Sequence, residues 1–429
     1  MPAPVPPPPS PLAEAGGDVP SEQAVSGPGH RLRLTLLMAG ACLPILGAVL
    51  IAPVLPQMHD HFADDRGVDV LVPMALTIPA LALALLAPFA GVLVDRLGRK
   101  RLLVTSTVAY AVLGTAPLWL DSLGAIVASR ALVGVTEAAI MTCCTTLIGD
   151  YYSGRQRERY LAMQTTCAAI SATAFFVLGG AAGSAGWRVP FWAYAVSLLL
   201  APAMAAFLPR PLPRPDDHAI QPSPTASEPA ERPFPWRPLA GTCALTVFGS
   251  ILFYTLQVEM AFLLDDMGVT ASGMIGLATA TTSAAIVLGT VVFAKAGRSP
   301  RAWLPTAFGL CSFGFAVVWL APNPVVLTIG ACVTCLGGGI MLPSLLTLAM
   351  SKLDYADRGR GTGLWMGSFF LGQFGCPLVA LALTSAVGTL ANAMGVLALA
   401  GTAAATALGV AARRLRTATV PEPLRQVAG

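Results

Sequence analysis

The sequence predicts an all-α membrane protein with twelve transmembrane helices, arranged as two six-helix bundles that are pseudo-repeats of each other. Three observations predict this class. The 429 residues are 55% hydrophobic and only 11% charged, whereas a soluble domain carries about 25% charged residues. Apolar segments of about 20 residues, long enough to cross a bilayer, recur along the chain. The cations gather in alternate loops, as the positive-inside rule requires.

The apolar segments fall into two sets of six. The first set lies near 33–56, 70–91, 102–120, 124–148, 160–183 and 188–208. The second set lies near 239–263, 272–294, 302–321, 325–350, 362–385 and 389–411. An even number of spans places both chain ends on the same side of the membrane.

Composition divides the remaining chain into bundles, tails and a linker. Residues 1–30 are rich in Pro, Ala, Gly and Ser, and are expected to form a disordered cytoplasmic tail because they cannot build a core. A six-helix bundle over 31–209 precedes a cytoplasmic linker over 210–238, which is rich in Pro, Asp, Glu and Arg. A second six-helix bundle covers 239–412, and a cytoplasmic tail covers 413–429.

The cations set the orientation. With the N-terminus inside, 23 of the 26 Lys and Arg residues fall in inside loops or tails; Arg66 and Arg188 fall outside, and Arg130 lies within a span. Moving the count by one span would destroy this asymmetry, so both termini are expected in the cytoplasm. Because the cations are partitioned by loop, the net charge of +4 does not indicate a nucleic-acid partner. The Arg-rich and Ala-rich composition suggests a GC-rich bacterial genome, so the expected location is a bacterial inner membrane.

The two halves also repeat in sequence. A shift of 204 residues lays Gly134 on Gly338, Asp150 on Asp354 and Tyr151 on Tyr355. Repeated halves in a membrane bundle are typical of transporters that rock around a central site.

A charged cluster separates the second and third spans. It contains Gly91, Asp95, Arg96, Gly98, Arg99 and Lys100. Because such a cluster cannot lie in hydrocarbon, it predicts a short turn at the membrane surface. The string Gly91-x-Leu93-x-Asp95-Arg96-x-Gly98-Arg99-Lys100 resembles the signature loop between helices 2 and 3 of the major facilitator superfamily. Arg130-x-x-x-Gly134 is similar to the second motif of that superfamily, and Ala52-Pro53-x-Leu55-Pro56 resembles its drug-efflux-like branch.

The resemblance implies a conformational latch at this cluster. Asp95 would pair with nearby arginines and face the start of helix 11, near Gly361 and Thr362. A carboxylate is stabilised at a helix N-terminus by unpaired N–H groups and a partial positive charge. Such a contact can form in one rocked state and break in the other. The alternative is a tight basic turn without a switching role.

One motif departs from the family pattern. Many antiporters of the superfamily carry Gly-Pro-x-x-Gly-Gly toward the end of helix 5. Here Gly179-Gly180 is kept, but the Gly-Pro is replaced by Phe175-Phe176. This departure leaves an uptake permease open as an alternative to export.

Ionisable and polar residues at membrane depth mark candidate coupling or substrate sites. Arg130 and Glu137 lie two turns apart on one face of the fourth span. Glu137, near mid-membrane, is expected to take up protons near neutral pH, with Arg130 as its modulator or as an anion anchor. The alternative is a structural ion pair that fixes this helix to a neighbour. Further candidates are Tyr254, Gln257 and Glu259 in the seventh span, Gln164 in the fifth and Gln373 in the eleventh.

A candidate gate lies in the tenth span. Gly337, Gly338 and Gly339 permit close backbone contact, and Pro343 permits a kink. Close packing without motion is the alternative.

No metal site, cofactor or enzymatic centre is expected. The chain has no Gly-x-x-x-x-Gly-Lys-Ser/Thr string and no His-Glu-x-x-His string. Cys332-x-x-Cys335 lacks a second pair of ligands and is expected to pack as small residues, whereas His59-Asp60-His61 is expected in a solvated loop.

The sequence therefore predicts a secondary active transporter rather than an enzyme. It would move a small organic solute by alternating access, with proton-coupled export as the expected mode. An uptake permease or symporter of a small metabolite, or a non-transporting membrane receptor with the same fold, are the alternatives. The expected partners are the solute, protons and the lipid bilayer, with no nucleic acid, and the expected state is a monomer.

Overall fold

The computed structural model describes residues 29–209, 236–297, 299–354 and 357–418, and the regular elements within these ranges are helical. The first half contains α1 (His30–Val49), η2 (Ala52–Val54), α2 (Leu55–His61), α3 (Val68–Leu86), α4 (Ala90–Leu97), α5 (Arg99–Thr115), η3 (Ala116–Leu118), α6 (Leu123–Tyr151), α7 (Gly154–Gly183), η4 (Val189–Val196) and α8 (Ser197–Phe207). The second half contains α9 (Trp236–Asp266), α10 (Ser272–Lys295), α11 (Pro300–Trp319), α12 (Pro324–Met350), α13 (Arg358–Val387) and α14 (Leu390–Ala418).

The prediction of twelve spans is confirmed. Twelve helical segments of the described chain are long and apolar enough to cross a membrane, six in each half. The largest differences from the predicted bounds lie at the start of the fifth span, which begins at Gly154 instead of near 160, and at the ends of the first two spans. The first continues through η2 and α2 to His61, and the second already ends at Leu86. Most of the predicted tail over 1–30 and of the linker over 210–238 lies outside the described residues, as does the end of the tail over 413–429.

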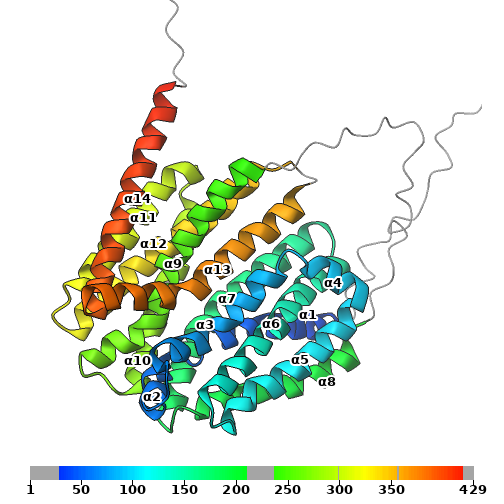
Figure 1. Ribbon diagram of the computed structural model, residues 1–429. Helices are drawn as coiled ribbons and strands as arrows, with labels where there is room; N and C mark the ends of the chain where they lie inside the picture. The colour runs from blue at the N-terminus through cyan, green and yellow to red at the C-terminus, as the bar shows by residue number, and fades with distance from the viewer. Residues whose placement is uncertain (1–28, 210–235, 298, 355–356, 419–429) are drawn as a thin grey trace, which may run out of the picture.

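Each half builds its own bundle. Figure 1 shows the helices of the first half, blue to green, grouped apart from the helices of the second half, green to red. One buried cluster of apolar residues is drawn almost wholly from the first half, and a second cluster wholly from the second half. Two hydrophobic cores, one per half, are what a pair of six-helix bundles requires.

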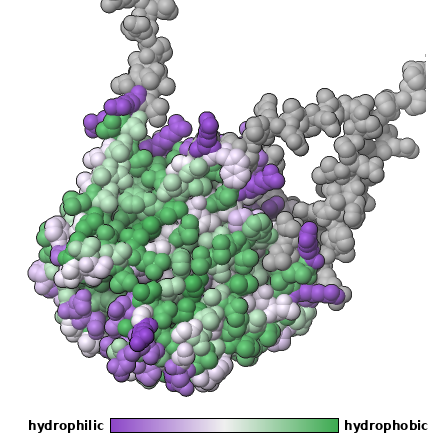
Figure 2. Space-filling view, viewed as in Figure 1, coloured by the Kyte–Doolittle hydropathy of each residue, from purple (hydrophilic) through white to green (hydrophobic). Residues whose placement is uncertain are grey.

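The surface matches a protein that lies in a bilayer. Figure 2 shows hydrophobic residues across the middle of the molecule and hydrophilic residues at two opposite ends. We call the end that holds Arg99, Arg155 and Arg358 the basic end. The opposite end, with Asp121 and Asp266, is called the acidic end. The helices of each bundle run alternately between these two ends.

The charged cluster predicted as a turn is largely helical, so the prediction of a turn over its whole length is wrong. Residues Ala90–Leu97 form the two-turn helix α4, and α5 begins at Arg99. Only Gly98 leaves the helical conformation, with φ +81° and ψ +116°. Charged side chains at the membrane surface remain hydrated in a helix, so the chain needs only a glycine to change direction.

The bundles contact each other at both ends. Toward the acidic end, α7 packs on α10 so closely that a Cβ atom on Gly276 would lie 2.8 Å from the Cα of Gly180. Thr173 on α7 also donates a hydrogen bond to Ser283 on α10 (3.0 Å). Toward the basic end, α13 packs on α3, where Gly367 faces the Ala84 carbonyl.

Candidate functional site

Arg130 lies at the centre of a polar network inside the first bundle. Its side chain is fully buried in α6. The guanidinium donates three hydrogen bonds to three other helical segments: to the Ala75 carbonyl on α3 (3.1 Å), the Tyr194 hydroxyl on η4 (2.7 Å) and the Gly47 carbonyl on α1 (2.8 Å). All three acceptors are neutral. Arg130 therefore joins four parts of the bundle and brings a positive charge into its core.

The sequence explains why two of these backbone acceptors are free. Pro79 lies four residues after Ala75 and has no N–H, so α3 cannot satisfy the Ala75 carbonyl. Gly47 lies in the last turn of α1, where helix carbonyls lack an intrahelical donor. Gly134 brings α6 onto this site, because a Cβ atom there would lie 2.6 Å from the Pro79 Cα. The Arg130-x-x-x-Gly134 motif thus fits against α3 at Pro79.

Glu137 lies on the same face of α6, beside the same residue of α1. It is only 2% exposed. Its Oε1 occupies the space above Gly47, where a Cβ atom would overlap it, and it has no hydrogen-bond partner. The described contacts include no ion pair between Glu137 and Arg130. Glu137 is therefore a buried carboxyl group with one oxygen available to a proton or a water molecule.

Two tyrosines complete this network, and the sequence interpretation missed both. Tyr110 on α5 donates to the Leu43 carbonyl of α1 (2.6 Å), and its ring lies 5.1 Å from that of Tyr194. Both tyrosines are fully buried. A tyrosine inside an apolar span needs a partner for its hydroxyl, so its position was a usable signal.

The predicted residues of the seventh span lie on α9, and one of them, Tyr254, lies at the contact between the bundles. Tyr254 packs against both hydrophobic cores, and its ring lies 5.5 Å from that of Phe369 on α13. Gln257 has a buried Nε2 atom without a hydrogen-bond partner. Glu259 is 5% exposed and has no described side-chain hydrogen bond. These residues give the second bundle its own set of buried polar groups.

The two remaining glutamines differ. Gln164 on α7 donates to the Thr145 hydroxyl on α6 (3.2 Å), an exposed contact that ties two neighbouring helices. Gln373 on α13 is buried, with 6% of its surface exposed. Of the two, only Gln373 lies in the interior.

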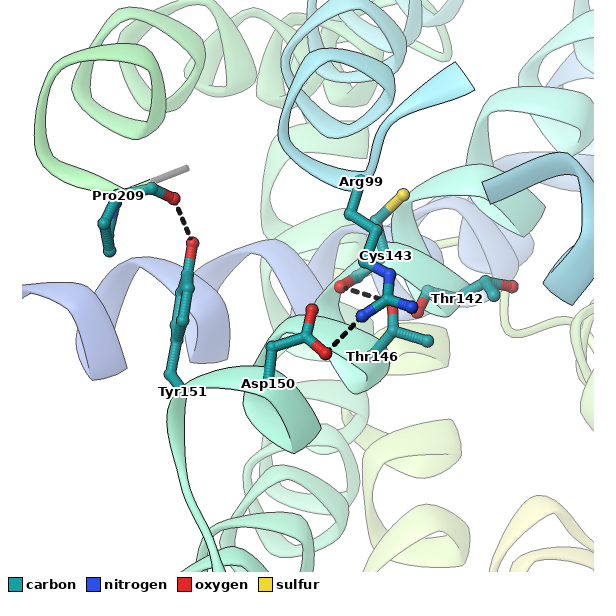
Figure 3. A network of polar contacts seen from close by, with 7 residues as sticks. All are labelled: Arg99, Thr142, Cys143, Thr146, Asp150, Tyr151 and Pro209. Carbon is teal, nitrogen blue, oxygen red and sulfur yellow. Dashed lines mark hydrogen bonds and ion pairs between the residues drawn. The ribbon is translucent and has the colours of Figure 1, made fainter. Parts of the chain in front are cut away.

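The predicted latch cluster anchors the basic end of the first bundle. Arg99 forms an ion pair with Asp150 at the end of α6, and the Lys100 Nζ donates to the Leu208 carbonyl beyond α8. Figure 3 shows Arg99 and Asp150 together with Tyr151, whose hydroxyl donates to the Pro209 carbonyl (2.6 Å). These contacts bind the start of α5 to the ends of α6 and α8.

The Asp95 contact predicted with the start of helix 11 lies outside the described side chains. The backbone near it is described. A Cβ atom on Gly363 in α13 would lie 3.2 Å from the Pro88 Cα, in the connection between α3 and α4. The start of α13 thus lies against the segment that leads into the cluster, and the Asp95 latch stays a prediction.

The glycines of the predicted gate pack against three different helices. Gly337 faces α11, Gly338 faces the Phe253 ring of α9, and Gly339 faces the Ile286 carbonyl of α10. Pro343 leaves the Gly339 carbonyl without its helical donor, and Thr290 of α10 donates to that carbonyl (3.2 Å). α12 is therefore packed tightly inside its own bundle at this point.

In the part of the chain that the structure describes, no three His, Cys, Asp or Glu side chains are grouped to hold a metal ion. The His59 Nε2 atom on α2 lies 2.9 Å from the Asp69 Oδ1 atom in the first turn of α3. The Cys332 thiol donates to the Thr281 hydroxyl.

Comparison with known proteins identifies the family. The model of the Major Facilitator Superfamily matches residues 37–356. The tetracycline resistance protein of class C from Escherichia coli is 26% identical over 380 residues, which cover 84% of this chain and 92% of that protein. Multidrug resistance protein 2 from Bacillus subtilis is 30% identical over 186 residues, 40% of this chain and 42% of that protein.

Solved structures agree on the fold. A bacterial homologue of the human lysosomal transporter Spinster, in an inward-facing and occupied conformation, gives a TM-score of 0.69 with 15% identity and covers 91% of this chain and 98% of its own. A peptide transporter in complex with sulfate gives the same score with 14% identity, over 89% of this chain and 94% of its own. With twelve apolar helices in two bundles and a family match over most of its length, the chain belongs to the Major Facilitator Superfamily and is a multi-pass membrane transporter, not an enzyme.

Proposed function

We propose that this transporter exports a small organic solute in exchange for protons, by alternating access between its two bundles. The observation that carries the proposal is Glu137, a carboxyl group buried at the midpoint of α6 with an unpaired oxygen. A group of this kind inside a transporter is by default a functional site, because burial without a partner costs free energy.

Arg130 and Glu137 have different roles in such a site. Three hydrogen bonds hold the Arg130 guanidinium in one position, so its positive charge stays at the same place in the bundle. Glu137 lacks such bonds at Oε1 and changes charge when a proton binds or leaves. Because both side chains touch Gly47, a change of charge on Glu137 acts directly on the contact between α6 and α1. Through this contact between α6 and α1, proton binding would favour one conformation of the bundle over the other.

The second bundle supplies the solute contacts in this proposal. Tyr254 lies where the two bundles meet, Gln257 and Gln373 offer amide groups, and Glu259 offers a second carboxyl group. Gln164, tied to Thr145, has a lesser role. A mostly apolar surrounding with few directing groups fits a small amphiphilic organic compound.

Alternating access needs contacts that open at each end in turn. The contact of α7 with α10 would separate at the acidic end, and the contact of α3 with α13 would separate at the basic end. We assign the latch role to Asp95 with Gly91, Arg96, Gly98, Arg99 and Lys100, next to the second contact. The glycines Gly337–Gly339 and Pro343 would allow α12 to bend as the bundles rock.

The orientation follows from charge. In this proposal the basic end, both termini and the 210–238 linker lie in the cytoplasm of a bacterial cell, and the protein is a monomer in the inner membrane; the Arg-rich turns support this orientation through the positive-inside rule. Export is preferred because the relatives named above carry names that refer to tetracycline resistance and multidrug resistance. Uptake remains the second candidate, because Phe175-Phe176 replaces the Gly-Pro of the antiporter motif.

Transport in proteoliposomes with an imposed pH gradient tests the proposal. The panel begins with tetracycline and continues with amphiphilic cations, organic anions and sugars. Glu137→Gln is expected to abolish proton-driven flux, whereas Glu158→Gln, at an exposed carboxyl group near the start of α7, serves as the matched control. Flux of equal size and pH dependence in wild type and Glu137→Gln would overturn the proton role. Solute movement only along the proton gradient, and not against it, would establish uptake instead.

A further inference from the structure

A groove of about 570 Å³ lies between α11 and α14 in the second bundle. α11 contributes Gly309, Ser312 and Phe313 to its walls, and α14 contributes Thr406, Gly409 and Arg413. On α11 these residues lie at positions i, i+3 and i+4, and on α14 at positions i, i+3 and i+7, as on one helix face. The groove is thus bounded by one face of each of two antiparallel helices.

The groove is a wedge that opens toward the basic end. In the acidic half the two helices touch: a Cβ atom on Gly395 would lie 2.7 Å from the Trp319 ring, and one on Gly401 would overlap the Ser312 hydroxyl. Nearer the basic end the helices diverge. A Cβ atom on Gly409 would meet only the Pro305 Cβ, at 3.9 Å, and one on Gly309 would meet nothing within 4 Å.

The wedge faces the membrane hydrocarbon. Both helices are membrane spans, and the lining residues Phe313 and Val410 are 61% and 49% exposed. Large apolar side chains exposed on a transmembrane helix face lipid chains. The wedge therefore lies within the leaflet at the basic end.

The walls offer almost no free polar groups to a ligand. The Ser312 hydroxyl donates to the Phe308 carbonyl (2.7 Å), Thr402 to the Ala398 carbonyl (2.8 Å) and Thr406 to the Thr402 carbonyl (3.0 Å). Each hydroxyl is satisfied within its own helix and presents its hydrocarbon to the groove. A polar solute would find few partners here, whereas an alkyl chain would fit.

Charge is concentrated at the wide mouth. Arg413 lines the groove one turn beyond Gly409, and Arg414 is the next residue. Guanidinium groups bind phosphate through charge-assisted hydrogen bonds. An apolar slot in the hydrocarbon that ends at an arginine at the interface matches a phospholipid, with its chain in the slot and its phosphate at the mouth.

We propose that the groove between α11 and α14 binds an anionic phospholipid of the leaflet at the basic end, with an acyl chain against Gly309 and the phosphate at Arg413. This site is separate from the buried groups of α6 and α9, so it does not depend on the proposed transport reaction. A lipid there fills the wedge and stabilises the packing of α14 on α11.

Native mass spectrometry of the purified full-length protein tests the site. The probes are phosphatidylglycerol and phosphatidylcholine with identical acyl chains. Wild type is expected to retain phosphatidylglycerol in preference to phosphatidylcholine. Arg413→Gln should lower that preference by about fivefold, the effect of one interfacial charge. Gly309→Leu should fill the groove without a clash and lower the retention of both lipids.

Two controls match these variants. Arg155→Gln removes an exposed cation from the basic end of the first bundle, and Gly241→Leu fills open space on α9. Neither control should change lipid retention. Normal phosphatidylglycerol retention by both Gly309→Leu and Arg413→Gln would overturn the proposal, as would equal retention of the two lipids by wild type. A dimer in wild type that Gly309→Leu abolishes would also overturn it and assign the groove to a second copy of the chain.

Discussion

The Arg130 Nε donates a hydrogen bond to the Ala75 carbonyl, an acceptor that exists because Pro79 cannot supply the usual helical N–H. The arginine of one helix thus completes the hydrogen bonding of another. Its two other bonds, to Gly47 and Tyr194, extend the same function to two more segments.

Replacement of Arg130 should destabilise the first bundle. Arg130→Gln leaves the Ala75 carbonyl without a donor, at a cost of about 1–3 kcal/mol for each buried acceptor left unpaired. Adding Pro79→Ala to this variant returns a backbone N–H to Ala75, so the double variant should regain part of the loss. Thermal unfolding in detergent measures both effects. An equal gain from Pro79→Ala in wild type would show a general helix effect and contradict the prediction.

Gly47→Ala should reproduce the loss caused by Glu137→Gln. The new Cβ atom would overlap the Glu137 Oε1 and displace the carboxyl group. Proton-driven flux should fall by about tenfold or more, because a small misplacement at a reacting centre is costly. In a Glu137→Gln background the same change should add little. Gly241→Ala, at a glycine with open space around it, is the control; a loss in that variant would make the Gly47 effect unspecific.

Gly276→Ala should open the acidic end. Its Cβ atom would lie 2.6 Å from the Phe176 carbonyl oxygen and 2.8 Å from the Gly180 Cα. Both neighbours are backbone atoms, so no side-chain rotation relieves the clash and α7 must separate from α10. Spin labels at Ser184 and Ala271 should show longer distances. Gly273→Ala, on the same helix but without a neighbour within 4 Å, should leave the distances unchanged; the same distances in both variants would contradict the prediction.

The two described Arg–Asp ion pairs of the first bundle should differ in strength. The Arg99–Asp150 pair has side chains 29% and 12% exposed, and the Arg188–Asp121 pair has side chains 34% and 88% exposed. Double-mutant cycles should give a coupling of about 1–3 kcal/mol for the first pair and below about 1 kcal/mol for the second. Thermal unfolding of the alanine variants measures both. A second pair as strong as the first would refute this ranking.

The sequence was sufficient for the twelve spans and their division into halves. Hydrocarbon excludes charged turns, so Lys100, Arg155 and Arg358 mark boundaries between spans. Each of them lies at the beginning of a helix. It was less informative about the charged cluster itself, because a run such as Ala90–Leu97 is hydrated equally well as a helix or as a turn. Only Gly98 marked the actual break.

The candidate site was predicted in part. The spacing of Arg130 and Glu137 correctly placed both on one face of α6, and both contact Gly47. The acceptors were not predicted, because the Ala75 carbonyl is made available by a proline four residues away and reached from a different helix. Contacts of this kind depend on how α1, α3 and η4 cross α6, and no local pattern encodes that crossing.

In the proposed alternating-access cycle, the contact of α7 with α10 seals the acidic end, and its composition has a consequence for the speed of the cycle. Gly180 and Gly276 meet backbone to backbone, so closing this contact immobilises no side-chain rotamers at these positions. A seal built from long side chains would lose up to about 2 kcal/mol of rotamer entropy for each residue every time it formed. The contact between the two glycines can therefore form and separate with little change in side-chain entropy. This favours rapid turnover over a long-lived closed state.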